Sequence, residues 1–477
     1  MDASDVYRGT EGEPLPGEPE PRRVEAEPGG GGLDGFFKLT ERGTTVATEL
    51  RAGVTTFMVM AYIIFVNANI LGDPNGAGLN PVAVAAATAL VAGVLTIAMG
   101  LIANYPFALA AGLGINAIVS YGLAAALGLG AAGAMGIIVL EGLAVTVLVL
   151  VGFREAVMTA IPLSLKRAIG VGIGLFILFI GFVNGGLIAT PPGGVPLVGF
   201  VFPTTLGALV TLLGLLITIA LFVLQIRGAL IISIIVTTII ALLLGVAKIP
   251  ADLFNSAYSF ETLGQFDLGK SFADLGIFVA ILTIFSIMLI DFFDTMGTVT
   301  GVAEQAGLTT PDGQVPGVGR VLLVDSVGAA VGGMAGISSN TTYIESAAGV
   351  AEGGRTGLTA VVVGVLFLAA ILLSPLAGIV PPQATAPVLI LVGFLMFTLI
   401  RDINIADVDD GIPALLTMIL MPLTYDISIG IGAGFISWTF IRVLRGRMSE
   451  IHPLMWVVTL AFVIFFAKDY IQPLLPK

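Results

Sequence analysis

The stretch LIDFFDTMGTVTGVAEQAGL, residues Leu289–Leu308, closes a long apolar run that begins near Ile277. It carries two acids, Asp291 and Asp294, whose spacing of three residues places them on one face of a helix. A carboxylate at membrane depth is costly, so it usually faces a cavity or a partner and marks a pathway. Because the two acids are neighbouring like charges in a low dielectric, we expect one of them to be protonated at neutral pH. The stretch predicts a membrane helix that lines a polar site; the alternative is a structural pair that hydrogen-bonds hydroxyl groups of neighbouring helices.

The composition is that of a polytopic membrane protein. Of the 477 residues, 57% are hydrophobic and 11% are charged, whereas a soluble chain is about a quarter charged. The chain has no cysteine, which excludes disulfides, thiol catalysis and thiolate metal sites, and neither a metal nor a cofactor is expected. The single histidine, His452, lies near the C-terminus, so a proton relay inside the membrane must use carboxylates. The net charge of −12 is no argument for a basic ligand, and no nucleic-acid partner is expected.

Apolar runs of about 20 residues recur along the chain and predict helical membrane spans. A last apolar run, Pro453–Ala467, is short for a span and is expected to form a helix on the cytoplasmic side. Residues 1–35 are polar and lack the apolar core of a signal peptide, so we expect a disordered cytoplasmic tail. Fourteen spans are predicted, at 52–71, 82–103, 107–126, 131–152, 167–184, 203–224, 228–246, 274–299, 318–335, 338–350, 356–374, 385–400, 411–425 and 427–445.

The distribution of basic residues favours this count. With the N-terminus inside, only Lys248 and Lys270 fall in outer loops, as the positive-inside rule requires. Merging 411–445 into one span would put the Arg442–Arg447 cluster outside. Both termini are therefore expected in the cytoplasm, and the membrane is expected to be the plasma membrane. The basic residues that fall inside are Arg154, Lys166, Arg167, Arg227, Arg320, Arg355, Arg401, Arg442, Arg445 and Arg447.

Fourteen spans divide into seven and seven, and an odd number per half inverts the second half. Two segments, 107–126 and 338–350, are interrupted by glycine or polar residues, and each is the third span of its half. This match in position predicts two inverted repeats with a binding site near the membrane midplane, between the two broken segments.

The first broken segment reads ALAAGLGINAIVSY at 108–121. Gly112 and Gly114 permit non-helical backbone, and a half-helix that starts near Gly114 would aim free N–H groups into a cavity. Asn116 would then offer both a donor and an acceptor to a ligand. The alternative is an ordinary glycine-rich helix contact.

The second broken segment reads ISSNTTYIESAAG at 337–349. Irregular polar backbone at this depth is tolerated only where protein or a cavity surrounds it, and Glu345 follows in the first helical turn, where the dipole favours an anion. The alternative is a surface-loop glutamate. Two other acids, Glu141 and Asp325, lie in otherwise apolar spans; each either hydrogen-bonds within the core or lies near a proton route.

Four pieces of the chain resemble a known family: ELRAGVTTFMVMAYIIFVNANIL (Glu49–Leu71), AGLGINA (Ala111–Ala117), DFFDTMGT (Asp291–Thr298) and YIESAAGVAEGGRTGLTA (Tyr343–Ala360). In order and spacing they are similar to the AzgA-like hypoxanthine/adenine/guanine permeases, the purine branch of the nucleobase transporters. The resemblance covers nearly all of the chain after about residue 35.

The resemblance implies an all-α membrane fold of fourteen spans in two inverted seven-span repeats, with broken third and tenth spans. A core domain would comprise 36–153 (spans one to four) and 273–376 (spans eight to eleven). A gate domain would comprise 154–248 (spans five to seven) and 377–447 (spans twelve to fourteen). The remaining parts would be an extracytoplasmic loop at 249–272 and a C-terminal interfacial helix at 448–477. Members of the wider group tend to form homodimers through the gate domain.

The resemblance also implies proton-coupled import of adenine, guanine or hypoxanthine by alternating access. The substrate would bind between the two domains, and whether Asp291 or Asp294 contacts it stays open. The implied substrate-binding residues are Asn116, Asp294, Glu345, Ser346, Ile115 and Ile344, and the implied proton-coupling residues are Asp291, Asp294 and Glu345.

Other functions fit the residues less well. Uracil and xanthine relatives carry paired asparagines where Ser346 and Ala347 stand here, which favours purines. An anion permease would face repulsion from the buried acids with no buried arginine to offset it. An intramembrane aspartyl protease would need a Gly-x-Gly-Asp motif, which is absent from the sequence, so we expect a transporter and no enzyme. Coupling to Na⁺ in place of protons, and a passive channel, stay open.

Overall fold

The computed structural model describes residues 32–152, 161–191, 198–201, 204–249, 259–310 and 314–467. The predicted N-terminal tail at 1–35 lies outside these ranges except for its last residues, where α1 (Leu33–Phe37) begins. Residues 250–258 of the predicted loop at 249–272, and residues 468–477 of the predicted C-terminal segment, also lie outside them.

The described chain is a helical polytopic membrane protein. Nine of its helical stretches are long and apolar enough to cross a membrane. Three more helices at predicted spans, α10 (Ala229–Leu243), α13 (Val318–Met334) and α17 (Val408–Thr424), have 15 to 17 residues. The nine are α2 (Val46–Met60) with α3 (Ile63–Gly72), α4 (Pro81–Ala98) with η1 (Met99–Ala103), α6 (Gly130–Leu150), α8 (Leu163–Asn184), α9 (Leu206–Val223), α12 (Ile277–Gln305), α15 (Gly357–Ala370) with η3 (Ile371–Gly378), α16 (Pro382–Phe397) with η4 (Thr398–Asp402), and α18 (Ile427–Leu444).

Side-chain caps fix where several helices begin. The Asn80 side chain accepts a hydrogen bond from the backbone N–H of Val82, and Pro81 occupies the first turn of α4. This combination suits a helix start, because the proline has no N–H to leave unsatisfied. His452 does the same for α19 (Pro453–Phe466): its Nδ1 accepts from the N–H of Leu454 at 3.2 Å.

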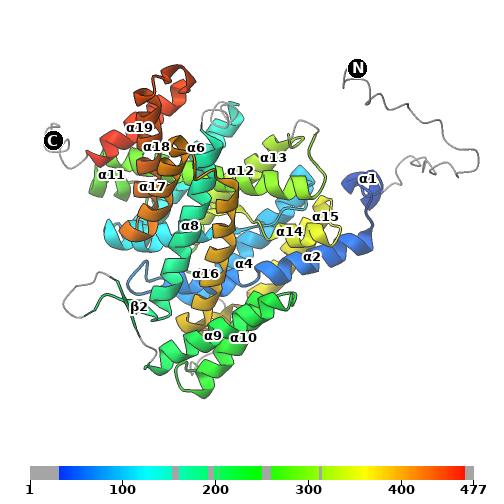
Figure 1. Ribbon diagram of the computed structural model, residues 1–477. Helices are drawn as coiled ribbons and strands as arrows, with labels where there is room; N and C mark the ends of the chain where they lie inside the picture. The colour runs from blue at the N-terminus through cyan, green and yellow to red at the C-terminus, as the bar shows by residue number, and fades with distance from the viewer. Residues whose placement is uncertain are drawn as a thin grey trace, which may run out of the picture.

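The helices pack in two sets. The first set contains α2, α3, α4, α6, α12, α13, α14 (Ser346–Ala351) and α15; the second contains α8, α9, α10, α16, α17 and α18 (Figure 1). Within the first set, a Cβ added to Gly364 of α15 would lie 2.5 Å from the carbonyl oxygen of Gly93 on α4. Small residues at such positions allow membrane helices to approach closely.

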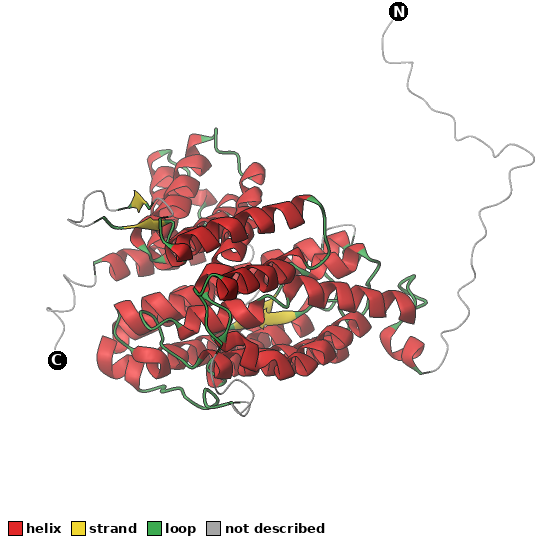
Figure 2. Cartoon of the chain, turned by 90° about the horizontal axis from the view of Figure 1, so that it is seen from below, coloured by secondary structure: helices red, strands yellow, loops and turns green. Residues whose placement is uncertain are grey.

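Two short strands lie among the helices of the first set, where Figure 2 shows them in yellow. Strand β1 (Leu109–Ala111) pairs antiparallel with β4 (Asn340–Thr342), with Ala110 opposite Thr341. The pairing satisfies the backbone groups of two extended segments inside an apolar bundle, where unpaired groups are costly. These strands belong to the two segments predicted as broken spans. A second pair, β2 (Ile188–Ala189) and β3 (Gly199–Phe200), joins residues between α8 and α9.

Each strand of the first pair leads into a short helix. After β1 the chain forms α5 (Leu113–Ala117), which continues as η2 (Ile118–Ala126), and after β4 it forms α14. The backbone pairing extends past the strands, because Gly112 N–H donates to Ser339 O and Tyr343 N–H donates to Ala108 O, both at 2.9 Å.

The C-terminal helix α19 packs along α18. Thr439 and Thr459 share a hydrogen bond of 2.7 Å, and the rings of Phe435 and Phe462 stack with centroids 5.9 Å apart. A Cβ on Gly432 would meet the rings of Phe462 and Phe466. Residue numbers rise along α19 as they fall along α18, so the two helices run antiparallel. The location of α19 relative to the membrane surface stays a prediction.

Candidate functional site

The antiparallel pairing of β1 with β4 brings the two predicted half-helices together. Ser346, the first residue of α14, is fully buried, and its hydroxyl accepts a hydrogen bond of 3.0 Å from the backbone N–H of Ala108. The Tyr343 hydroxyl donates to the carbonyl oxygen of Ala111. Both hydrogen bonds join one broken segment to the other. Ser346 therefore stabilises the contact between the segments, in addition to the substrate-binding role that the sequence predicts for it.

Glu345 directly precedes α14 and is half-buried. The hydroxyl of Tyr62 donates a 2.5 Å hydrogen bond to its Oε1. Tyr62 is fully buried in the break between α2 and α3. Sequence reasoning missed this residue; the available signal was a tyrosine in an apolar span, because a buried hydroxyl needs a partner.

Asn116 lies in α5 and is fully buried. Neither its Oδ1 nor its Nδ2 has a hydrogen-bond partner among the described residues. Leaving a buried amide unpaired costs about 1–3 kcal/mol for each group, and an orphaned polar side chain in a native structure calls for an explanation. A polar ligand at this position would supply the missing partner.

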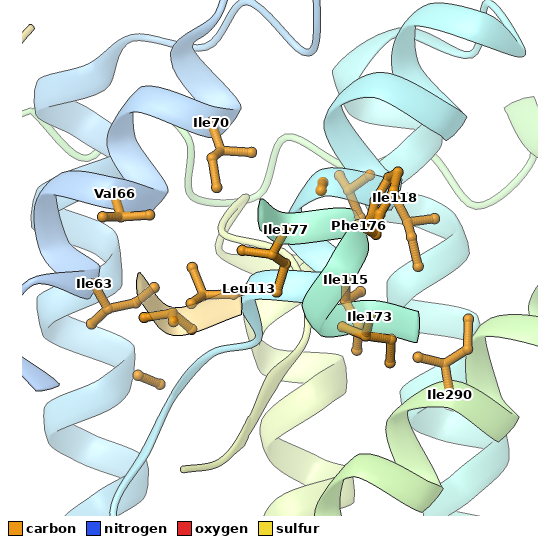
Figure 3. Packing of buried hydrophobic residues seen from close by; sticks show 14 of the residues in the cluster. Ile63, Val66, Ile70, Leu113, Ile115, Ile118, Ile173, Phe176, Ile177 and Ile290 are labelled. Atoms are coloured by element: carbon orange, nitrogen blue, oxygen red, sulfur yellow. The ribbon is translucent and has the colours of Figure 1, made fainter. Parts of the chain in front are cut away.

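The two apolar residues predicted at the site lie in different surroundings. Ile115 is buried in the contact between α5 and α8, where Figure 3 shows it near Ile173 and Phe176. The approach is close, since a Cβ on Gly114 would lie 2.7 Å from Cγ2 of Ile173. Ile344 is 52% exposed and outside that cluster.

The two acids of α12 both interact with Asp325 but differ in their other partners. Asp294, which is half-buried, interacts electrostatically with Glu345 and Asp325. Asp291 is buried, and its Oδ2 accepts a 3.0 Å hydrogen bond from the hydroxyl of Ser339, while its Oδ1 has no partner among the described residues. Asp291 also interacts with Glu141 of α6. The structure therefore brings Asp294 toward Glu345 and Asp291 toward Glu141.

The carboxyl of Asp325 accepts three hydrogen bonds. Oδ1 accepts from the N–H and the hydroxyl of Thr342, and Oδ2 accepts from the hydroxyl of Thr295, all at 2.7 Å. These bonds join α13, β4 and α12. Of the two roles that the sequence left open for Asp325, the geometry supports hydrogen bonding within the core.

Glu49 was not singled out from the sequence, yet it is fully buried and organises the start of α15. Its carboxylate accepts from the backbone N–H groups of Arg355, Thr356 and Thr359, at 2.9, 3.3 and 3.1 Å, and from the Thr359 hydroxyl. An acid here pairs with the free N–H groups and the positive end of the helix dipole.

Comparison with known sequences identifies relatives over most of the chain. A model of the Permease family (Xan_ur_permease) matches residues 47–433. The guanine/hypoxanthine permease PbuG of Bacillus subtilis is 39% identical over 438 residues, which cover 90% of this chain and 98% of PbuG. The adenine permease AdeP of Escherichia coli is 40% identical over 436 residues, which cover 91% of this chain and 96% of AdeP.

Comparison with solved structures finds the same fold at low identity. The transmembrane domain of the cyanobacterial bicarbonate transporter BicA matches with a TM-score of 0.58 and 17% identity, covering 81% of this chain and 96% of that domain. The structure of SLC26A9 matches with a TM-score of 0.60 and 11% identity, covering 84% of this chain and 66% of that protein.

Proposed function

Since the chain belongs to the permease family whose model matches residues 47–433, we propose that it imports purine nucleobases together with protons. The observation that carries the proposal is Asn116, a fully buried amide without a partner among the described residues. Asn116 lies on one broken segment and Glu345 lies on the other. The backbone pairing of β1 with β4 holds the two segments together. The names of PbuG and AdeP support a purine as the substrate.

The chemistry of a purine suits this set of side chains. A neutral heteroaromatic ring offers N–H donors and ring-nitrogen acceptors along its edge, which Asn116 can meet in both senses. Asp294 and Glu345 accept from ring N–H or exocyclic amine groups. Ile344, which is 52% exposed, packs on an apolar face of the ring, Ile115 supports the site from the contact between α5 and α8, and Ser346 holds the two segments in register. Because Asp294 interacts with Glu345 in the structure, we assign Asp294 to the substrate side and Asp291 to proton coupling.

We propose that the protein transports its substrate by alternating access. The first helix set is the core domain that carries the substrate, and the second set is the gate domain against which it moves. The fourteen spans form two inverted repeats, the protein dimerises through the gate domain, and both termini lie on the cytoplasmic side of the plasma membrane. Support comes from the packing of the helices in two sets and from the likeness in fold to other transporters.

The test is uptake of radiolabelled adenine, guanine, hypoxanthine, xanthine and uracil in cells that lack their own permeases, with and without a protonophore. We expect accumulation of at least one of the first three purines, abolished by the protonophore and by Glu345→Gln. The matched control is Glu304→Gln, an exposed glutamate on α12, which should transport like the wild type. Accumulation of uracil or xanthine alone, or uptake that requires sodium and ignores the protonophore, would contradict the proposal.

A further inference from the structure

We propose that Glu141 on α6 and Asp291 on α12 form the site that carries the coupled proton, separate from the residues that bind the substrate. This inference rests on the proposed proton-coupled import. It adds a residue, Glu141, and assigns the proton to a pair that lies between two helices of the first set.

The geometry of the pair is unusual for two acids. Glu141 is 0% exposed and Asp291 is 2% exposed. Both oxygens of Glu141 and Oδ1 of Asp291 have no hydrogen-bond partner among the described residues. The carboxyl of Glu141 lies beside Asp291 and the hydroxyl of Ser339, on helices that pack against each other. An unpartnered, fully buried carboxyl thus faces a second carboxyl that has one free oxygen.

Among the residues that the structure describes, the charged groups that interact with the pair are all acids. Asp325 on α13 interacts with both members, and Asp294 on α12 interacts with Asp291. Asp325 is held by three hydrogen bonds from Thr295 and Thr342. Two adjacent carboxyl groups in a low dielectric, without a cation, do not both ionise. A proton on either member lets it donate a hydrogen bond to the other, which satisfies Oδ1 of Asp291 and one of the two oxygens of Glu141.

The pair is connected to the substrate residues through the second broken segment. Ser339, which donates to Asp291, directly precedes β4, and β4 leads to Glu345. The preceding residue, Ser338, is fully buried and has a φ of 74°, a left-handed conformation that is uncommon for residues other than glycine. Strain of this kind concentrates at functional and switching sites. A change in charge at Asp291 would therefore act on a strained segment that leads to Glu345, the residue that the proposed function assigns to the substrate.

The proton exchange is balanced. One proton from outside binds the singly protonated pair, a carboxylic acid hydrogen-bonded to a carboxylate, and gives two carboxylic acids. Its release to the cytoplasm restores one acid and one carboxylate, and no other bond forms or breaks.

The experiment uses the full chain, purified and reconstituted in vesicles, with the purine that the wild type accumulates. One assay measures accumulation driven by an imposed pH gradient, and a second measures counterflow, the exchange of labelled for unlabelled purine without net proton movement. Glu141→Gln and Asp291→Asn should each lose gradient-driven accumulation while counterflow continues at the wild-type rate. Glu304→Gln, exposed on the same helix as Asp291, should keep both activities, and Glu345→Gln should lose both.

Two results would overturn the inference. Gradient-driven accumulation at the wild-type level in both variants would show that the pair does not carry the proton. Loss of counterflow as well, in variants that elute and unfold like the wild type, would place the pair in substrate binding.

Infrared spectroscopy of the purified protein separates this inference from the proposed function. The wild type should show the C=O band of a buried protonated carboxyl, and Glu141→Gln should weaken it. If the wild type transports no purine, the proposed function fails, while the band still decides whether the pair holds a proton. Absence of the band would overturn the pair even if purine uptake is observed.

Discussion

The hydroxyl of Tyr62 orients the carboxyl of Glu345, and this contact makes a prediction at the scale of one residue. Hydrogen bonds to charged groups contribute about 1.5–3 kcal/mol, so Tyr62→Phe should raise the KM for purine uptake by about tenfold or more. Tyr105→Phe removes a hydroxyl that donates to the Pro316 carbonyl instead, and it should leave KM unchanged. A wild-type KM in Tyr62→Phe, measured by initial rates of uptake, would count against this role.

Two buried asparagines make a matched pair for separating function from stability. Asn67 donates to the Thr88 hydroxyl at 2.9 Å, whereas the Asn116 amide has no partner among the described residues. Asn67→Leu should lower the free energy of unfolding by about 1–3 kcal/mol, while Asn116→Leu should not lower it and should abolish uptake. Thermal unfolding in detergent, measured beside uptake, checks both. A greater loss of stability in Asn116→Leu than in Asn67→Leu would contradict the assignment.

The sequence identified single site residues but not their partners. Asn116 and Glu345 stand out because each follows a break in an apolar run, and such breaks are visible in a single sequence. The spacing of Asp291 and Asp294 predicts one shared helix face. It cannot indicate that one interacts with Glu141 and the other with Glu345, because those contacts depend on which distant helices pack against α12.

Helix contacts give a prediction at the scale of the element. A Cβ on Gly364 of α15 would lie 2.5 Å from the Gly93 oxygen on α4, whereas a Cβ on Gly301 of α12 would meet nothing within 4 Å. Gly364→Ala should therefore push the helices apart and destabilise the protein by about 1–3 kcal/mol. Gly301→Ala should be neutral or stabilising by up to about 1 kcal/mol. Equal unfolding temperatures for the two variants would show that the α4–α15 contact tolerates a methyl group.

Elements were predicted unevenly from the sequence. Long helices follow from apolar runs alone, and half-helices after the breaks follow from Gly112 and from the SSNTT stretch. The pairing of β1 with β4 could not be predicted, because two three-residue strands far apart in the sequence carry no local signal of their register. The register comes from the packing of helices on either side, which the sequence pattern does not contain.

At the scale of the whole molecule, two contacts join the helix sets at opposite ends of the α2–α3 span. Near its start, Arg227 of the second set forms an ion pair with Glu352, which follows α14. Just after its end, the Tyr121 hydroxyl donates to Asp73 at 2.9 Å and accepts from Asn184 of α8 at 3.1 Å. Alternating access in the proposed sense requires these contacts to open in turn.

Weakening one contact should shift the equilibrium between the inward-open and outward-open states in one direction, and weakening the other should shift it in the opposite direction. Arg227→Gln should favour the inward-open state and Tyr121→Phe the outward-open state. The Arg227 shift should amount to about 1 kcal/mol or less, because Arg227 is 71% exposed. Because the chain has no cysteine, one cysteine introduced on either face reports accessibility to a thiol reagent without background. A shift in the same direction for both variants would rule out opposed gates.

The antiparallel pairing of β1 and β4 has a thermodynamic corollary. Asn116 and Glu345 lie on segments whose backbones are hydrogen-bonded to each other through β1 and β4. The distance between them should therefore stay the same in the inward-open and the outward-open state. A binding site that keeps its shape as it travels ranks its ligands in the same order on both sides of the membrane. The ratio of affinities for two purines should then be equal whether they approach from the periphery or from the cytosol, and selectivity becomes a constant of the fold while accessibility alone varies.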